Sequence, residues 1–209
     1  LVIDLATANT VVYATGQGDS ANMGDFTGTV DVTNGWLVVG DTNSDGAGAT
    51  ADFNAGKVIV RNGATLSTHF GVGKHDNDEY TIFASDIDMM SGATLLNIDG
   101  NTRYTGNIRF NVVDPAADNP SYDADGVVKI DQHWQKKLEF TGLLEGDGTV
   151  QLANTNNEEN AIYLITGENN TFSGTFELID DNGSGGSDTI DLRLGTETAA
   201  QFADIKLSS

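Results

Sequence analysis

The chain has 209 residues and a formal net charge of −21, from 10 basic and 31 acidic side chains, and it contains no cysteine. This charge repels phosphate backbones and anionic headgroups, so composition argues against nucleic acid as a partner and against attachment to a membrane surface. The absence of cysteine excludes a disulfide scaffold, a thiolate metal site and a cysteine nucleophile. The length suits one domain or one elongated repeat array.

The polar composition favours β-structure. Aspartate outnumbers glutamate by 23 to 8, and the chain contains 25 glycines and 19 asparagines. Asp and Asn compete with a helix for backbone hydrogen bonds, whereas Gly and Asn suit turns. The apolar residues occur in short β-branched runs, which are typical of strands. The composition therefore predicts many strands separated by tight turns.

Alternation of apolar and polar residues predicts short strands along the whole chain. In chain order these are Val2–Leu5, Thr10–Ala14, Thr29–Val32, Trp36–Val39, Lys57–Arg61, Tyr80–Ala84, Thr94–Ile98, Asn107–Val113, Val127–Ile130, Leu138–Phe140, Thr149–Leu152, Ala161–Ile165, Thr175–Ile179 and Thr189–Leu194. Only Glu197–Ala203 has a helical pattern. No run approaches the roughly 20 apolar residues of a membrane span, so we expect no direct membrane insertion by this segment.

Two sequence units recur at irregular spacing. The first has an aromatic residue, a small hydroxyl residue, Gly and then alternating apolar residues, and its copies begin at Phe26, Tyr104, Phe140 and Phe172. The second is Asn-Gly-Ala-Thr-Leu at 62–66, which returns at 91–95 and more loosely at 147–152. The motifs recur with the same residue pattern, but the number of residues between them varies. This indicates a repeat array in which loops of different length lie on one face.

These units suggest how successive coils would stack. Each aromatic residue would lie on its counterpart in the next coil, Gly would turn the corner, and alternate apolar side chains would fill the interior. At roughly 20–25 residues per coil the chain would make about nine coils, spanning roughly 45 Å. We therefore predict an all-β fold of the parallel β-solenoid type over residues 1–209. An antiparallel β-sandwich whose hairpins share turn chemistry is the alternative.

Three runs resemble a known family. They are 57–66, 143–150 and 169–175, and they are similar to the β-strand repeats of bacterial autotransporter passengers. The resemblance implies a right-handed parallel β-helix displayed outside a bacterium as part of a larger adhesin or surface protein. The resemblance assigns no catalytic or ligand-binding residue in this chain. The lack of cysteine suits this setting, because a passenger crosses the outer membrane unfolded.

One acidic loop has the pattern of a calcium site. Asp41, Asn43 and Asp45 occupy the first, third and fifth positions before a glycine, and Asp52 falls at the twelfth position. Oxygen ligands at these positions converge on one cation when the glycine folds the loop back. A solvated turn rich in Asp and Asn is the alternative. We therefore expect Ca²⁺ as the one candidate cofactor.

Aromatic residues and loops indicate where a ligand would bind. Trp134 and Tyr122 are candidates for stacking on a sugar ring, with packing inside the fold as the alternative. Residues 113–125, which contain both prolines, and the polar residues 154–160 are predicted to leave the coils as loops. Binding specificity in repeat arrays often lies on such loops.

The sequence favours a protein without catalytic activity. Parallel β-helices include polysaccharide lyases and hydrolases, but His-Glu-x-x-His, Gly-x-Ser-x-Gly and a phosphate-binding lysine loop do not occur in the sequence. The histidines, His69, His75 and His133, have no ligand-like spacing.

These patterns together predict one solenoid segment of a larger, extracellular bacterial surface protein, acting as an adhesin or a structural stalk. Its expected partners are host or biofilm glycans or proteins, or further copies of itself. A carbohydrate-binding module and a glycan-active enzyme are the alternatives.

Overall fold

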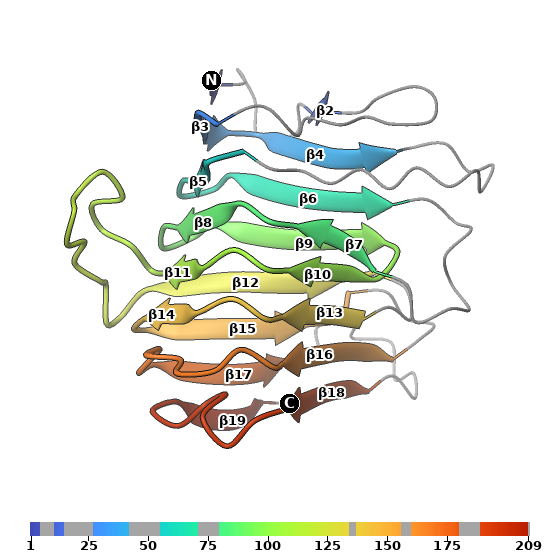
Figure 1. Cartoon of the computed structure of the whole chain (residues 1–209), viewed down its shortest axis with the longest axis vertical. Coiled ribbons are helices and arrows are strands. Elements are labelled where there is room, and N and C mark those ends of the chain that lie inside the picture. The colour runs from blue at the N-terminus through green and yellow to red at the C-terminus, as the bar shows by residue number, and fades with distance from the viewer. Residues whose placement is uncertain are drawn as a thin grey trace.

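The computed structural model describes eight stretches of the chain, 1–4, 11–14, 27–41, 55–70, 80–133, 137–155, 160–179 and 189–208. Within them the protein is all-β, with no helix, and its strands form three parallel sheets (Figure 1). The all-β prediction is confirmed.

The three sheets contain six, eight and five strands. The six-stranded sheet has β1 (Val2–Asp4), β3 (Thr29–Asn34), β5 (Lys57–Val60), β8 (Asp86–Met89), β11 (Ile108–Phe110) and β14 (Leu144–Gly146). The eight-stranded sheet has β2 (Val11–Ala14), β4 (Trp36–Asp41), β6 (Thr65–Phe70), β9 (Thr94–Asp99), β12 (Val127–Gln132), β15 (Thr149–Ala153), β17 (Thr175–Ile179) and β19 (Asp204–Ser208). The five-stranded sheet has β7 (Thr81–Phe83), β10 (Thr102–Tyr104), β13 (Lys137–Phe140), β16 (Ala161–Ile165) and β18 (Ile190–Leu194). Every pairing between these strands is parallel, so the antiparallel sandwich is wrong.

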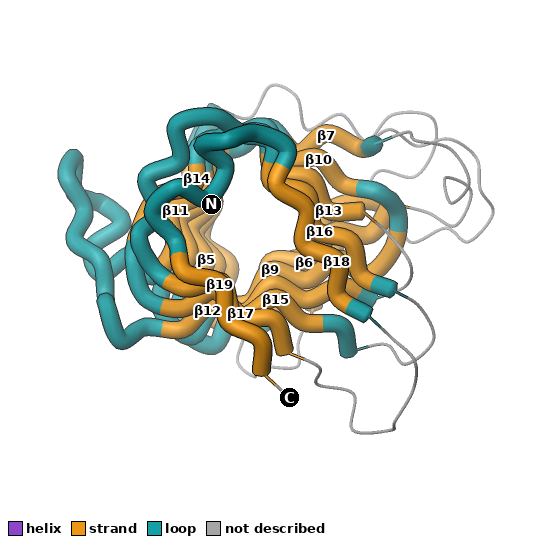
Figure 2. The backbone as a smooth tube through the Cα atoms, turned by 90° about the horizontal axis from the view of Figure 1, so that it is seen from below, coloured by secondary structure: helices purple, strands orange, loops and turns teal. Residues whose placement is uncertain are grey.

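The chain visits the sheets in a repeating order. From β7 to β15 it passes three times through the five-, six- and eight-stranded sheets in turn, and the sheets surround a common interior (Figure 2). Each pass lies beside the one before. Val58 pairs with Ile87, 29 residues later, whereas Ile87 pairs with Ile108 after 21 residues and Ile108 with Leu144 after 36. The predicted coil of 20–25 residues is therefore too short for most passes, because the connections lengthen them.

The core consists of rows of apolar side chains that follow the register. One row on the six-stranded sheet, almost fully buried, comprises Val30, Val58, Ile87, Ile108 and Leu144. Because side chains alternate along a strand, the neighbours of each buried residue point outward. Each pass therefore covers its apolar face with the passes above and below, and burial of this surface holds the stack together.

Aromatic stacking follows the first sequence unit in part. The rings of Tyr104 and Phe140 stack with centroids 5.4 Å apart and planes 14° from parallel, and Phe83 lies 5.4 Å from Tyr104 on the other side. The prediction that each aromatic residue stacks on its counterpart is confirmed for Tyr104 and Phe140.

Phe172 does not continue this row, so the prediction is wrong for that copy. Its ring packs against Phe110, at 5.5 Å, and against Phe176, at 4.8 Å. The reason is topological, because this copy precedes β17 of the eight-stranded sheet, whereas the copies at Tyr104 and Phe140 precede strands of the six-stranded sheet. Ile165 occupies the place beside Phe140 instead.

The second sequence unit forms a corner between the six- and eight-stranded sheets. Gly63, Gly92 and Gly148 precede β6, β9 and β15 with φ values of 74°, 83° and 77°. Only glycine adopts this left-handed conformation without strain. The Gly63 amide donates to the carbonyl oxygen of Gly92 at 3.1 Å, so successive corners are also linked by hydrogen bonds.

Two predictions about irregular segments have different outcomes. Residues 113–125 leave the stack as a loop between β11 and β12, as predicted (Figure 1). An antiparallel bridge between Val112 and Tyr122 closes this loop near its base. The helical pattern at Glu197–Ala203 does not give a helix, because residues 197–202 form turns. Of the loop predicted at 154–160, residues 156–159 lie outside the described part.

Candidate functional site

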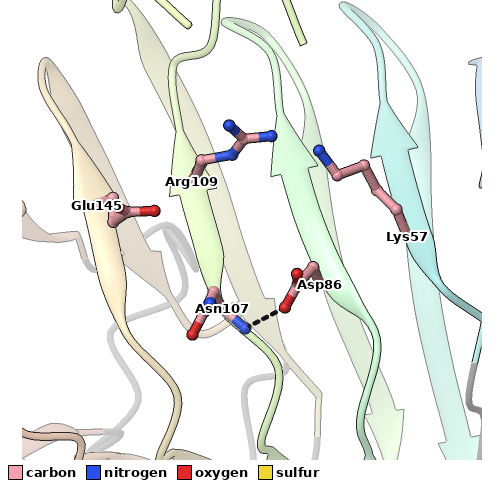
Figure 3. A pocket seen from close by; sticks show the side chains of 5 residues that line it. All are labelled: Lys57, Asp86, Asn107, Arg109 and Glu145. Atoms are coloured by element: carbon pink, nitrogen blue, oxygen red, sulfur yellow. Dashed lines mark hydrogen bonds between the residues drawn. The ribbon is translucent and has the colours of Figure 1, made fainter. Parts of the chain in front are cut away.

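The outer face of the six-stranded sheet has a polar hollow. Five side chains line it, and they come from β5, β8, the start of β11 and β14 (Figure 3): Lys57, Asp86, Asn107, Arg109 and Glu145. Its volume is about 250 Å³. These residues flank the buried row of the same strands, so alternation along each strand turns them outward. We call this site the outer hollow.

The buried carboxylate of Asp88 anchors the two cationic side chains of the outer hollow. Its carboxylate accepts two hydrogen bonds from Arg109, from Nε and Nη2 at 2.6 Å each, and one from Lys57 Nζ at 2.9 Å. The Asp88 side chain is 1% exposed, while those of Arg109 and Lys57 are 16% and 29% exposed. A buried carboxylate requires such partners. Asp88 therefore holds both cationic side chains in defined positions.

The opposite side of the outer hollow presents hydrogen-bond acceptors. Asp86 Oδ1 accepts the backbone amide of Asn107 at 2.8 Å, and Asn107 Oδ1 accepts the backbone amide of Leu143 at 3.1 Å. Within the described ranges no group donates a hydrogen bond to the Glu145 carboxylate. The second oxygen of Asp86 and both oxygens of Glu145 are thus able to accept hydrogen bonds from a ligand.

Tyr122 lies beside these charges at the base of the 113–125 loop. It is half-buried, and burial, together with the negative charge of Glu145, raises the pKa of its phenol. Burial acts to lower the pKa of Arg109, but the hydrogen bond and charge of Asp88 outweigh it and raise that pKa. At neutral pH the site therefore combines a neutral phenol with a fully charged guanidinium.

The other candidate residues from the sequence are only partly described. Asp41 is the last residue of β4, and Asn43, Asp45 and Asp52 lie outside the described residues. Trp134 also lies outside them, so its pairing with Tyr122 is untested. Among the described residues, no three His, Asp or Glu side chains gather as a metal site. The described histidines, at 69 and 133, are half-buried and lie away from the lining of the outer hollow.

The sequence alone missed the residues of the outer hollow. Lys57 and Arg109 are two of only ten basic residues in the chain, and each is next to a buried apolar residue of a strand. A rare basic residue on the polar side of a strand was the available signal. It does not reveal the partner, because Lys57 and Asp88 are 31 residues apart and meet only through strand pairing.

The arrangement suits polar recognition better than proton transfer at Asp88. All hydrogen bonds to that carboxylate come from the cationic side chains of Lys57 and Arg109, so its oxygens are already engaged within the protein. The remaining donors and acceptors around the outer hollow match the hydroxyl groups of a polar ligand.

Comparison with protein-family models, with curated proteins and with solved structures found no match. In the described part of the chain, no helix is long and apolar enough to cross a membrane.

Proposed function

We propose that the chain is a right-handed parallel β-helix segment of an extracellular bacterial surface protein, and that it acts as an adhesin or a structural stalk without catalytic activity. The supporting observation is the stacking of parallel strands in register from β1 and β2 to β18 and β19. Eight strands at about 4.8 Å spacing span roughly 35 Å, a length suited to holding a binding surface away from its base.

Two features support the finer description of the fold. The three sheets surround one interior, and successive passes enter them in the same order. Connections between parallel strands are overwhelmingly right-handed, which favours the right-handed form of such a coil. The runs that resemble autotransporter passengers include β5, the corner at Gly63, β14 and the approach to β17, which are the repeating parts of the stack.

The outer surface supports display rather than burial against another protein. Outward-facing residues of neighbouring strands form ion pairs along the stack, as between Arg103 and Glu139 at 2.7 Å and between Arg61 and Asp31 at 2.7 Å. Pairs that are partly exposed contribute little stability. The excess of acidic side chains keeps such a long surface soluble. The net charge of −21 is consistent with this role.

Surface labelling tests this proposal directly. Antibodies raised against the segment should bind intact cells of the source bacterium at the same level as permeabilised cells. Labelling that requires permeabilisation would overturn the extracellular assignment. In parallel, the purified chain should release no reducing ends and no unsaturated products from neutral or acidic polysaccharides, with or without Ca²⁺. Product release that disappears in the Glu145→Gln variant would establish a glycan-active enzyme instead.

A further inference from the structure

We propose that the outer hollow binds a single uncharged sugar residue, so that a neutral glycan is the ligand of this surface. This inference rests on the proposed function and adds to it a site and a ligand class. It depends on four properties of the site, namely its hydrogen-bonding groups, their rigidity, its size and its charge.

The outer hollow presents both donors and acceptors of hydrogen bonds. Lys57 and Arg109 supply donors on one side, and Asp86 and Glu145 supply acceptors on the others, as Figure 3 shows. A sugar hydroxyl both donates and accepts, so adjacent hydroxyls of one ring can bind a carboxylate and a cationic side chain at the same time. Hydrogen bonds to charged groups are also stronger than those between neutral groups.

The donors are held in place before any ligand arrives. Asp88 accepts hydrogen bonds from both Lys57 and Arg109, and strand pairing fixes the backbones of β5, β8, β11 and β14 relative to one another. Long cationic side chains normally lose considerable freedom on binding a ligand. Here much of that loss has already occurred on folding. The buried Asp88 therefore acts as a positioning residue for the site.

Size and charge define the ligand class. The volume of about 250 Å³ lies below the 300–1,000 Å³ that is typical of drug-sized ligand sites, so it suits one ring rather than a chain of sugars. The negative charges of Asp86, Asp88 and Glu145 exceed the positive charges of Lys57 and Arg109 by one. Together with the acidic surface, this disfavours sugars that carry carboxylate or sulfate groups. The phenol of Tyr122 interacts electrostatically with Glu145 and Arg109, so an aromatic residue also lies near these charges.

The test is a glycan array probed with the full chain, followed by titration of the strongest neutral glycan. Glu145→Gln and Asp86→Asn keep the shape of each side chain and remove its charge. Each should weaken binding at least about tenfold, the loss expected for one hydrogen bond to a charged group. Glu168→Gln, at an exposed position outside the outer hollow, is the matched control and should bind as the unmodified chain does. Melting temperatures of all variants should agree closely, which separates loss of contact from loss of fold.

Three results would overturn the inference. The first is binding of acidic glycans with no binding of neutral ones, and the second is equal binding by Glu145→Gln and the control. The third is binding that disappears when Ca²⁺ is chelated, because the proposed contacts are direct. In each of these cases, labelling of intact cells would still support the extracellular location of the chain. The experiments therefore distinguish failure of the glycan site from failure of the proposed function.

Discussion

Replacing Asp88 by asparagine should destabilise the stack at the centre of the six-stranded sheet. The substitution keeps the size of the side chain and one acceptor oxygen, but it removes the charge that holds Arg109 and Lys57. Arg109 loses a paired interaction with two hydrogen bonds of 2.6 Å, and Lys57 loses one of 2.9 Å. Both cations then remain partly buried without the carboxylate that pairs with them.

The loss in free energy of unfolding can be estimated from the burial of the Asp88 ion pairs. Removing one member of a buried ion pair costs about 3–5 kcal/mol, because the remaining charge is uncompensated. Since the Lys57 side chain is 29% exposed and can be hydrated, we expect the lower end, about 3 kcal/mol in the free energy of unfolding. At roughly 2–4 °C per kcal/mol for chains of this length, the melting temperature should fall by about 6–12 °C.

Thermal unfolding followed by circular dichroism measures this change, and Asp191→Asn provides the control. Asp191 binds Arg193, but the two side chains are 40% and 54% exposed, so its loss should cost less than about 1 kcal/mol. If Asp88→Asn lowers the melting temperature no more than Asp191→Asn does, then the Asp88 cluster does not stabilise the fold and the explanation given for it is wrong.

Three further predictions concern the corners, pH and calcium. Gly63→Ala should cost about 1–2 kcal/mol by thermal unfolding, because a left-handed φ of 74° strains alanine although no atom lies within 4 Å of the added Cβ. Gly142→Ala should cost more, because its Cβ would clash with the backbone carbonyl oxygen of Gly106; equal losses would contradict this account of the glycines. Hydrogen bonds, above all from Lys206, lower the pKa of Glu177 from 4.5 to about 2. The ionised Glu177 therefore stabilises the fold above about pH 4.5, and this contribution is lost as the pH falls toward 2. Glu177→Gln should therefore flatten the dependence of melting temperature on pH in that interval, and an unchanged slope would refute this. Excess Ca²⁺ should raise the melting temperature relative to chelator, and Asp45→Asn should abolish the difference; no difference in the unmodified chain would exclude the calcium loop.

Strands with several alternating residues were predictable from the sequence. The segments Ala161–Ile165 and Thr175–Ile179 match β16 and β17 in the structure. Burial alternates strictly along β16, whereas in β17 only Phe176 is buried, so there the alternation of apolar residues in the sequence is the clearer signal. The glycine corners were predictable for a similar local reason, since an Asn-Gly or Ser-Gly pair before an apolar run requires a left-handed residue. Both signals depend only on neighbours in the sequence.

Very short strands and strand ends were not predictable in this way. The sequence missed β8, β10, β14 and β19. The three residues of β10 and β14 are too few to show a periodicity, whereas β8 and β19 have four and five residues. The strand expected at Asn107–Val113 ends at Phe110, because Asn111 adopts a φ of 55° and its amide group donates to the Asp147 carbonyl oxygen of the next pass at 2.7 Å. That partner is 36 residues away, so only tertiary pairing sets this boundary.

The outer hollow was beyond sequence analysis for the same reason. Lys57, Asp88 and Glu145 belong to three different passes, and the offsets between passes vary from 21 to 36 residues. With unequal offsets, no fixed period places these three side chains together. The register of the strands decides both the position of the site and the pairing of its charges.

Parallel pairing in this register is the basis of both proposals, and an engineered disulfide tests it most directly. Arg103 of β10 lies opposite Glu139 of β13, and the chain has no other cysteine to interfere. Strands about 4.8 Å apart fall within the Cα separations of 4.4–6.8 Å that disulfides require. The variant Arg103→Cys/Glu139→Cys should therefore close its disulfide almost completely on mild oxidation, as measured by mass spectrometry of the linked peptides. Arg103→Cys/Gln151→Cys, whose second cysteine lies in β15 of another sheet, should not close. An open matched pair, or equal closure of the mismatched pair, would contradict the stacked parallel architecture.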